Sequence, residues 1–209
     1  MRIAAVCPVK GHQRRITMED GTAVLIDTTV WEGSPYGVGS SLSDAELEDL
    51  CAVSERRRME SKAVFLLSKR DLSRRELEQK LCREKGRYHP ERHEQAVQTA
   101  ARMEELGYVR DAEYAHRLAQ RYAREKLYPR RRIEDELLRK GIDRETAREA
   151  ASAVETDETE MALAFLAKKR YTVSRDTKEV QKIAAAMARY GYSAAVIRRV
   201  LREEDLSDE

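Results

Sequence analysis

Arginine is the residue type in this sequence whose spacing most clearly points to binding chemistry. A row of arginines lies in the middle of the chain, and its first members are spaced to follow one side of a helix. Each guanidinium donates hydrogen bonds in a planar fork that fits phosphate or carboxylate oxygens. The candidate residues for binding a partner or DNA are Arg117, Arg121, Arg124, Arg130, Arg131, Arg132, Lys69 and Arg70. A solvated helix surface with internal ion pairs would show the same residues, and charge alone does not separate the two interpretations.

The charge balance places the basic excess in the middle of the chain. Over the whole sequence 40 Lys+Arg nearly cancel 38 Asp+Glu, for a net charge of +2. Residues 60–155 carry 23 basic and 19 acidic residues, whereas residues 1–59 carry 7 and 9 and residues 156–209 carry 10 of each. The molecule is therefore not a general polycation, and any anion-binding surface is expected in the middle.

Motifs for catalysis or cofactor binding are missing from the sequence. There is no GxxxxGK[ST] loop, no HExxH and no GxSxG. His89 and His93 are four residues apart, but Pro90 fits the first turn of a helix and places His89 before it. Three widely spaced cysteines without a CxxC pair suit a reducing cytoplasm. We expect a cytoplasmic protein that is not an enzyme and that holds no cofactor or metal.

The elements that position these arginines are predicted to be helices. With 37% charged residues, four Pro and nine Gly in 209 residues, the composition is typical of helical proteins. The first forty residues differ and predict three short antiparallel strands, the last over residues 23–30, with Asp20-Gly21 as a hairpin turn. A capping box at Ser43–Glu46 predicts a helix running towards Arg58, and everything from Glu60 onward is predicted to be helical. No apolar stretch is long enough to span a membrane, and no signal peptide is apparent.

The helical part repeats itself. Residues 60–70 align without gaps with residues 160–170, and five of the eleven positions are identical. At half that offset, Ile133, Leu137 and Gly141 match Ile183, Met187 and Gly191, and Leu77, Leu81 and Gly86 fit the same template with one inserted residue. Repeats of this length indicate stacked helical units that bury their apolar faces against their neighbours.

The predicted fold is therefore mostly α: a tandem array of three three-helix repeats, elongated and curved, after a small N-terminal antiparallel β unit. The expected divisions are a β unit with a loop at 1–42, a linking helix at 43–59, and repeats at 60–109, 110–156 and 157–209.

Three blocks of this sequence resemble the RecX family, the bacterial modulators of the RecA recombinase. The first is Ala63–Arg70 followed by Ser73–Leu81. The second is Leu106–Ala115, with Gly107-Tyr108, Asp111 and Tyr114-Ala115. The third is Ile133–Ile142. With the last repeat, the resemblance covers about residues 60–205. Residues 128–132 depart from it, since many members carry a Lys/Arg-Gly pair there.

The resemblance implies a function as well as a fold. It implies a monomeric, non-enzymatic regulator of homologous recombination, DNA repair and the SOS response. Such a protein would bind the groove of the RecA–single-stranded DNA filament and limit its assembly, ATP hydrolysis and strand exchange. Weak direct binding to DNA would be compatible with that role. Two alternatives remain open: a DNA-binding regulator of the helix-turn-helix type, and a helical-repeat adaptor without nucleic-acid contact.

Overall fold

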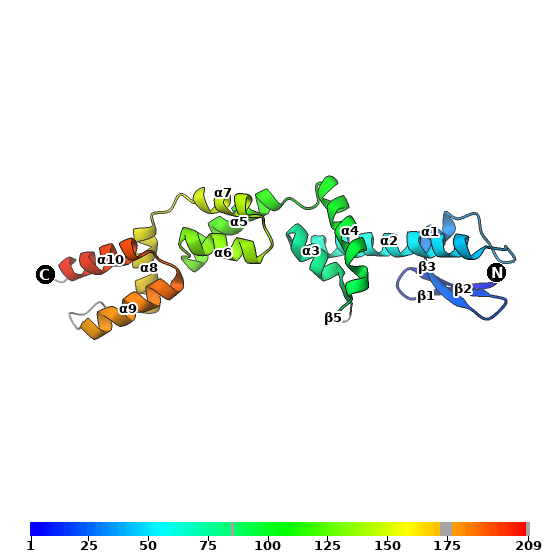
Figure 1. Ribbon diagram of the computed structural model, residues 1–209, viewed down its shortest axis with the longest axis horizontal. Coiled ribbons are helices and arrows are strands. Elements are labelled where there is room, and N and C mark those ends of the chain that lie inside the picture. The colour runs from blue at the N-terminus through cyan, green and yellow to red at the C-terminus, as the bar shows by residue number, and fades with distance from the viewer. Residues whose placement is uncertain (85, 172–176, 208–209) are drawn as a thin grey trace. The chain divides into compact units, whose positions relative to one another are not determined.

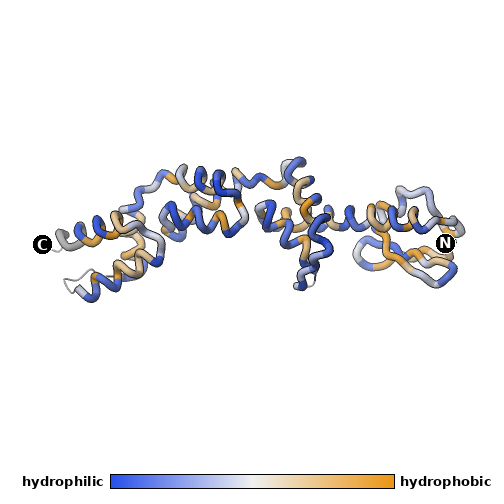
Figure 2. The backbone as a smooth tube through the Cα atoms, in the orientation of Figure 1, coloured by the Kyte–Doolittle hydropathy of each residue, from blue (hydrophilic) through white to orange (hydrophobic). Residues whose placement is uncertain are grey.

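A computed structural model describes residues 1–84, 86–171 and 177–207 of the chain. The chain packs as two compact units: Met1–Asp71 with Leu77–Tyr108, and Leu72–Glu76 with Val109–Glu209. The predicted class is confirmed, since helices dominate and a three-stranded sheet lies at the N-terminus (Figure 1). Along the helices, hydrophobic and hydrophilic positions alternate, as expected for amphipathic helices that each bury one side (Figure 2).

The sheet of the first unit consists of β1 (Ile3–Val9), β2 (Gln13–Met18) and β3 (Ala23–Asp27), antiparallel in the order β1-β2-β3. Alternate residues of β2, Ile16 and Met18, point into the core, as the two-residue period of a strand requires. Ile3, Ile26 and Trp31 join them in a cluster with three leucines of the following segment.

The third strand is shorter than predicted, because a helix interrupts it. The β-branched run up to Val30 favours a strand, yet α1 (Thr28–Glu32) begins directly after β3. The carboxylate of Asp27 accepts hydrogen bonds from the backbone N–H groups of Thr29 and Val30, so it caps the new helix. This local cap outweighs the strand propensity of the two threonines and the valine.

Helix α2 (Asp44–Lys69) begins at the predicted capping box, where Ser43 and Glu46 satisfy each other's backbone N–H groups. The predicted end near Arg58 is wrong, because the helix continues without interruption to Lys69. Met59 and Ala63 are both buried, so the apolar side of the helix passes across the expected boundary. The hydroxyl of Ser54 accepts a 2.7 Å hydrogen bond from the N–H of Asp27 and ties the helix to the sheet.

The next segment is not wholly helical as predicted. Helix α3 (Arg74–Leu81) is followed by a small hairpin, β4 (Arg83–Glu84) and β5 (Arg87–Tyr88), with Gly86 in its turn. Gly86 therefore does not end a helix in the way that its match to Gly141 predicts. A single 3₁₀ turn, η1 (Pro90–Arg92), then leads into α4 (His93–Glu105), with Pro90 at the first position as expected.

The second unit contains the remaining helices around one continuous core. They are α5 (Asp111–Arg121), the π-turn η2 (Tyr122–Lys126), α6 (Arg130–Arg139), α7 (Arg144–Ser152), α8 (Glu158–Lys169), α9 (Thr177–Tyr190) and α10 (Ala194–Ser207). The 50-residue period is visible in burial: Ile142, Ala147 and Ala150 are buried, and so are Tyr192, Ile197 and Val200. Gly141 and Gly191 both have positive φ after a helix, as predicted for residues that end helices.

Candidate partner-binding surface

The first two arginines of the predicted row lie on the exposed side of α5. Tyr114 and Leu118 are buried on the opposite side, and their burial orients the helix. Arg117 and Arg121 are exposed. The guanidinium of Arg117 lies 3.8 Å from the carboxylate of Glu113, and both side chains are 56% exposed, so this pair contributes little stability.

Arg124 is also exposed, but it lies in a π-helical turn, which is wider than the α-helical turn that its spacing predicts. It lies in η2, where the π-helical pattern of i→i+5 hydrogen bonds rotates the side chains away from the α-helical stripe. The turn ends at Leu127, which adopts a left-handed conformation with φ 56°. Arg124 lines a recess of about 330 Å³ beside Val154, Glu155 and Thr156.

Two of the predicted binding residues, Arg130 and Arg132, also make contacts within the fold. The backbone N–H of Arg130 donates to Glu158 at 3.0 Å, and its guanidinium lies 3.4 Å from the carbonyl of Val154. The guanidinium of Arg132 donates to the carbonyl of Tyr190 at 3.0 Å and lies between two rings, 4.1 Å from the centroid of Tyr128 and 4.5 Å from that of Tyr190. Arg130 thus joins α6 to the start of α8, and Arg132 joins α6 to the end of α9.

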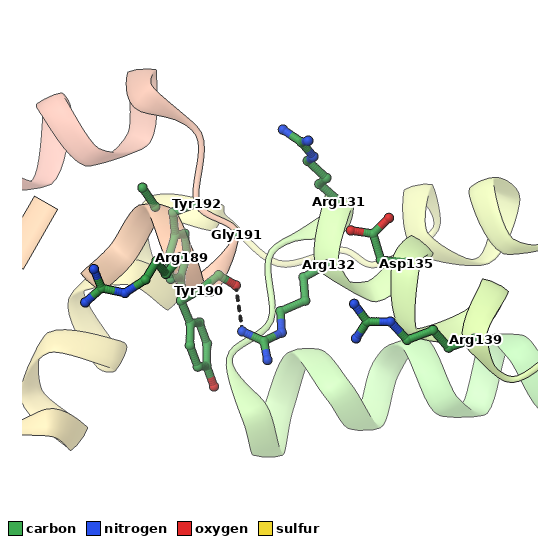
Figure 3. A pocket seen from close by; sticks show the side chains of 9 residues that line it. Arg131, Arg132, Asp135, Arg139, Arg189, Tyr190, Gly191 and Tyr192 are labelled. Atoms are coloured by element: carbon green, nitrogen blue, oxygen red, sulfur yellow. Dashed lines mark hydrogen bonds between the residues drawn. The ribbon is translucent and has the colours of Figure 1, made fainter. Parts of the chain in front are cut away.

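Arg131 lies at a polar pocket of about 320 Å³ between α6 and the turn after α9. The residues around it are Arg131, Arg132, Asp135, Arg139, Ala188, Arg189, Tyr190, Gly191 and Tyr192. In Figure 3, Arg132 reaches across to the carbonyl of Tyr190, while Arg131 and Arg189 extend outward from the two sides of the pocket. Four guanidiniums and a single carboxylate therefore surround this recess.

Arg139 and Arg189 were missed by sequence reasoning that concentrated on the densest row. A signal for them exists, because Arg139 follows Arg131 by eight residues and so shares its helix face. Arg189 follows Arg139 by the repeat length of 50 residues. Combining the helical period with the repeat period would have identified both.

Lys69 and Arg70 lie at the end of α2 and belong to the other compact unit. Both are exposed. The ammonium of Lys69 lies 5.1 Å from the ring centroid of Phe65, within the range of a cation–π contact. The two residues form a basic end of helix α2.

The first joint between repeats lies at the start of α3, and the pocket at Arg131 and Arg132 lies at the second joint. Ser73 and Glu76 form the predicted second capping box at the start of α3. The hydroxyl of Ser73 also donates to the carbonyl of Lys140, and the Lys140 ammonium donates to Glu76 at 2.7 Å. Tyr114 donates to the other oxygen of Glu76. The start of α3 is thus joined to α5 and to the end of α6 through one carboxylate.

Burial perturbs two tyrosines near the pocket. Removal from water raises the pKa of Tyr190 above its ordinary value, and it raises the pKa of Tyr192 further. Both hydroxyls donate to backbone carbonyls, Tyr190 to Lys126 and Tyr192 to Leu127. These two residues therefore stay neutral donors at physiological pH and hold the turn beside the pocket.

Residues 1–84, 86–171 and 177–207 contain no group of three or more His, Cys, Asp or Glu side chains placed to hold a metal ion. Within the same ranges, no helix combines the length and the apolar character that crossing a membrane requires. The three cysteines are free, with Cys7 exposed, Cys51 partly buried and Cys82 buried.

Comparison with known proteins finds similarity to RecX proteins. The model for the second three-helix domain of RecX matches residues 111–150, and that for the third matches residues 155–201. A regulatory protein RecX from Clostridioides difficile (strain 630) is 29% identical over 169 residues, which are 79% of this chain and 76% of that protein.

Solved structures agree on the fold. A crystal structure of regulatory protein RecX superposes with a TM-score of 0.69 at 18% identity, covering 95% of this chain and 98% of the other. The crystal structure of RecX from Lactobacillus salivarius superposes with a TM-score of 0.61 at 22% identity, covering 74% and 99% of the two chains. Two consecutive domain matches, the relative across most of the chain and the shared fold all point the same way. These findings support the RecX family for this chain.

Proposed function

We propose that this protein regulates the RecA recombinase by binding its filament on single-stranded DNA and limiting filament assembly, ATP hydrolysis and strand exchange. The observation that carries the proposal is the exposed arginine surface of Arg117, Arg121 and Arg124 on the second three-helix domain of a RecX-family chain. A filament offers two kinds of anion to such a surface, DNA phosphates and acidic side chains of the recombinase. Both are bound well by guanidinium forks.

The protein acts in this proposal by binding and not by catalysis. Arginine stays protonated throughout the physiological range and donates hydrogen bonds without accepting any. A surface built from such groups holds anions in place, whereas general acid–base catalysis needs groups that exchange protons near neutral pH. We place the activity in the cytoplasm and expect a monomer to be sufficient.

The experiment measures RecA ATPase on single-stranded DNA with increasing amounts of the full chain. We expect inhibition that saturates. Replacing Arg117, Arg121 and Arg124 by Glu keeps helix propensity nearly unchanged, because Glu is almost as good a helix former as Arg. The triple variant should retain its circular dichroism and lose most of its inhibition and filament binding.

The matched control reverses three arginines that are exposed on α7 and α10, namely Arg148, Arg198 and Arg202. Arg199 is left unchanged, because its guanidinium contacts the hydroxyl of Thr159 at 3.4 Å. The control should inhibit like the unmodified chain. If the unmodified chain leaves the RecA ATPase unaffected, the proposed function is wrong. If the control loses as much inhibition as the triple variant, the contact surface lies elsewhere.

A further inference from the structure

The pocket between α6 and the turn after α9 has more positive charge than the fold uses. Arg132 donates to the carbonyl of Tyr190, and Arg139 donates to Glu136 at 2.9 Å. Arg131 and Arg189 are exposed and contact no acceptor within the described part of the chain. Among the described residues that line the recess, Asp135 is the one with an acidic side chain, so the lining groups leave a positive excess that an anion would neutralise.

The base of the pocket is rigid. The guanidinium of Arg132 is held between the rings of Tyr128 and Tyr190. A Cβ at Gly191 would lie 3.1 Å from the Cβ of Arg132, so the turn approaches α6 closely. Tyr192 anchors the same turn by donating to the carbonyl of Leu127 at 2.7 Å. Arg131 and Arg189 thus project from a preorganised frame, which reduces the entropy lost when they bind a ligand.

The same pair of arginines occurs at the preceding joint between repeats. Helix α3 aligns with α6 at an offset of 56 residues, which pairs Leu77 with Ile133 and Arg75 with Arg131. The helix-ending turns align at an offset of 50, which pairs Arg139 with Arg189. The Arg75 side chain lies against the turn that follows α6, since a Cβ at Gly141 would be 2.5 Å from the Cβ of Arg75. Each joint therefore has one of these arginines on the earlier helix and one in the last turn of the later helix, while the arginine against the glycine is Arg75 at Gly141 and Arg132 at Gly191.

Repetition of this arrangement identifies the class of ligand. An isolated acidic side chain needs one such site, whereas a polymer with a charge on every unit meets the same site again at the next repeat. The phosphodiester backbone of a single strand has this property, and guanidinium forks bind its oxygens. The acidic residue Asp135 is not repeated, because the corresponding position in α3 is Gln79.

We propose that the arginine pairs Arg131/Arg189 and Arg75/Arg139 form two successive phosphate-binding sites for single-stranded nucleic acid. This inference rests on the proposed function, because it assigns the strand within the filament as the ligand. It goes further by adding contacts with the strand at the joints between repeats, beside those made by the exposed side of α5.

The test measures binding of a fluorescent oligothymidylate to the full chain by anisotropy, without RecA, over a range of salt concentrations. The variants are R131E/R189E and R75E/R139E. The control is R148E/R198E, an exposed pair that is also related by 50 residues. Each lost phosphate contact on a single strand reduces the slope of log K against log salt by about 0.7. We therefore expect each double variant to lower the slope by about 1.4, to weaken binding at least about tenfold at low salt, and the control to do neither.

Several outcomes would overturn the assignment. One is failure of the unmodified chain to bind the oligonucleotide at low salt, and another is an unchanged slope in both double variants. A third is a variant that binds the oligonucleotide normally but no longer inhibits the RecA ATPase, because the pairs would then contact the recombinase. If the double variants lose oligonucleotide binding while the unmodified chain has no effect on RecA, the result would support these sites and refute the proposed function. If a charge-reversal variant has an altered melting temperature, the same two arginines are replaced by Gln instead of Glu. A slope of log K against log salt that is reduced by the same amount in the Gln variant supports the sites.

Discussion

The two joints between repeats have the same backbone plan and opposite chemistry. At each joint the first N–H of a helix donates to the acidic residue that begins the first helix of the next repeat: the N–H of Arg74 donates to Asp111 at 2.9 Å, and the N–H of Arg130 donates to Glu158 at 3.0 Å. At each, the carbonyl before the helix-ending glycine accepts a hydrogen bond from the earlier repeat. A stacked array needs these bonds wherever two units meet, so they recur.

The side chains at the centres of the joints differ in charge. Glu76 at the first joint corresponds to Arg132 at the second, and Lys140 corresponds to Tyr190. The first joint is therefore an ion pair with a carboxylate at its centre, and the second is a guanidinium between aromatic rings. The repeat therefore fixes where units touch, while local substitutions decide how strongly the contact depends on salt.

The largest expected difference between the joints is in tolerance of a side chain at the glycine. A Cβ at Gly141 would lie 2.5 to 2.8 Å from three carbons of Arg75, near the base of that side chain, so α3 itself would have to move. At Gly191 the nearest atom would be 3.1 Å away. A Cβ at either position is destabilising because φ is positive. At Gly141 it also overlaps severely with Arg75, which should lower the free energy of unfolding by roughly 1–3 kcal/mol more.

Urea unfolding of G141A, G191A and G11A measures this ranking. Gly11 has a similar positive φ, and a Cβ there meets nothing within 4 Å, so it isolates the backbone contribution. The expected order of destabilisation is Gly141, then Gly191, then Gly11. Equal losses at Gly141 and Gly11 would show that the first joint is not tightly packed.

The next largest difference between the joints is in how strongly the coupling energy of their side chains depends on salt. A double-mutant cycle with Glu76→Gln and Lys140→Met isolates the ion pair from the other bonds of Glu76. Its side chains are 16% and 29% exposed, and we expect a coupling of about 1 kcal/mol at low salt that shrinks as salt is added. The cycle with Arg132→Ala and Tyr190→Leu should give a coupling of about 1–2 kcal/mol that changes little with salt. Equal salt dependence in the two cycles would contradict the assignment of an ionic and an aromatic joint.

Sequence patterns identified the features that depend on periodicity. The amphipathic helices, the β unit, both capping boxes and the positive φ at Gly141 and Gly191 follow from local spacing and backbone sterics. The predictions that failed depended on competition between local signals. Examples are the cap of Asp27, which ends β3 early, and the hairpin that replaces a helix ending at Gly86.

The use of individual side chains was harder to predict than their positions. Phe65 and Phe165 occupy identical repeat positions, yet Phe65 is 60% exposed and Phe165 is 3% exposed. Phe165 packs against Tyr190 at the end of α9 and against Tyr192 in the turn that follows. The corresponding region of the first repeat forms a hairpin. In the same way, only tertiary contacts reveal that Arg132 stabilises the fold while Arg131 remains exposed.

The smallest expected effect appears only at alkaline pH and only at the second joint. Burial raises the pKa values of Tyr190 and Tyr192 above their ordinary value, so the unfolded chain loses these protons first. Their stabilising contribution is complete below about pH 10 and is lost as pH rises through the raised values. At about pH 10.5 each group should cost less than about 1 kcal/mol in the free energy of unfolding. The Tyr192→Phe variant should show a weaker decline in stability between pH 9.5 and pH 11 than the unmodified chain, at about that size. An equally steep decline in both proteins would mean that Tyr192 titrates as an ordinary exposed tyrosine, and ultraviolet titration of the folded chain provides an independent check.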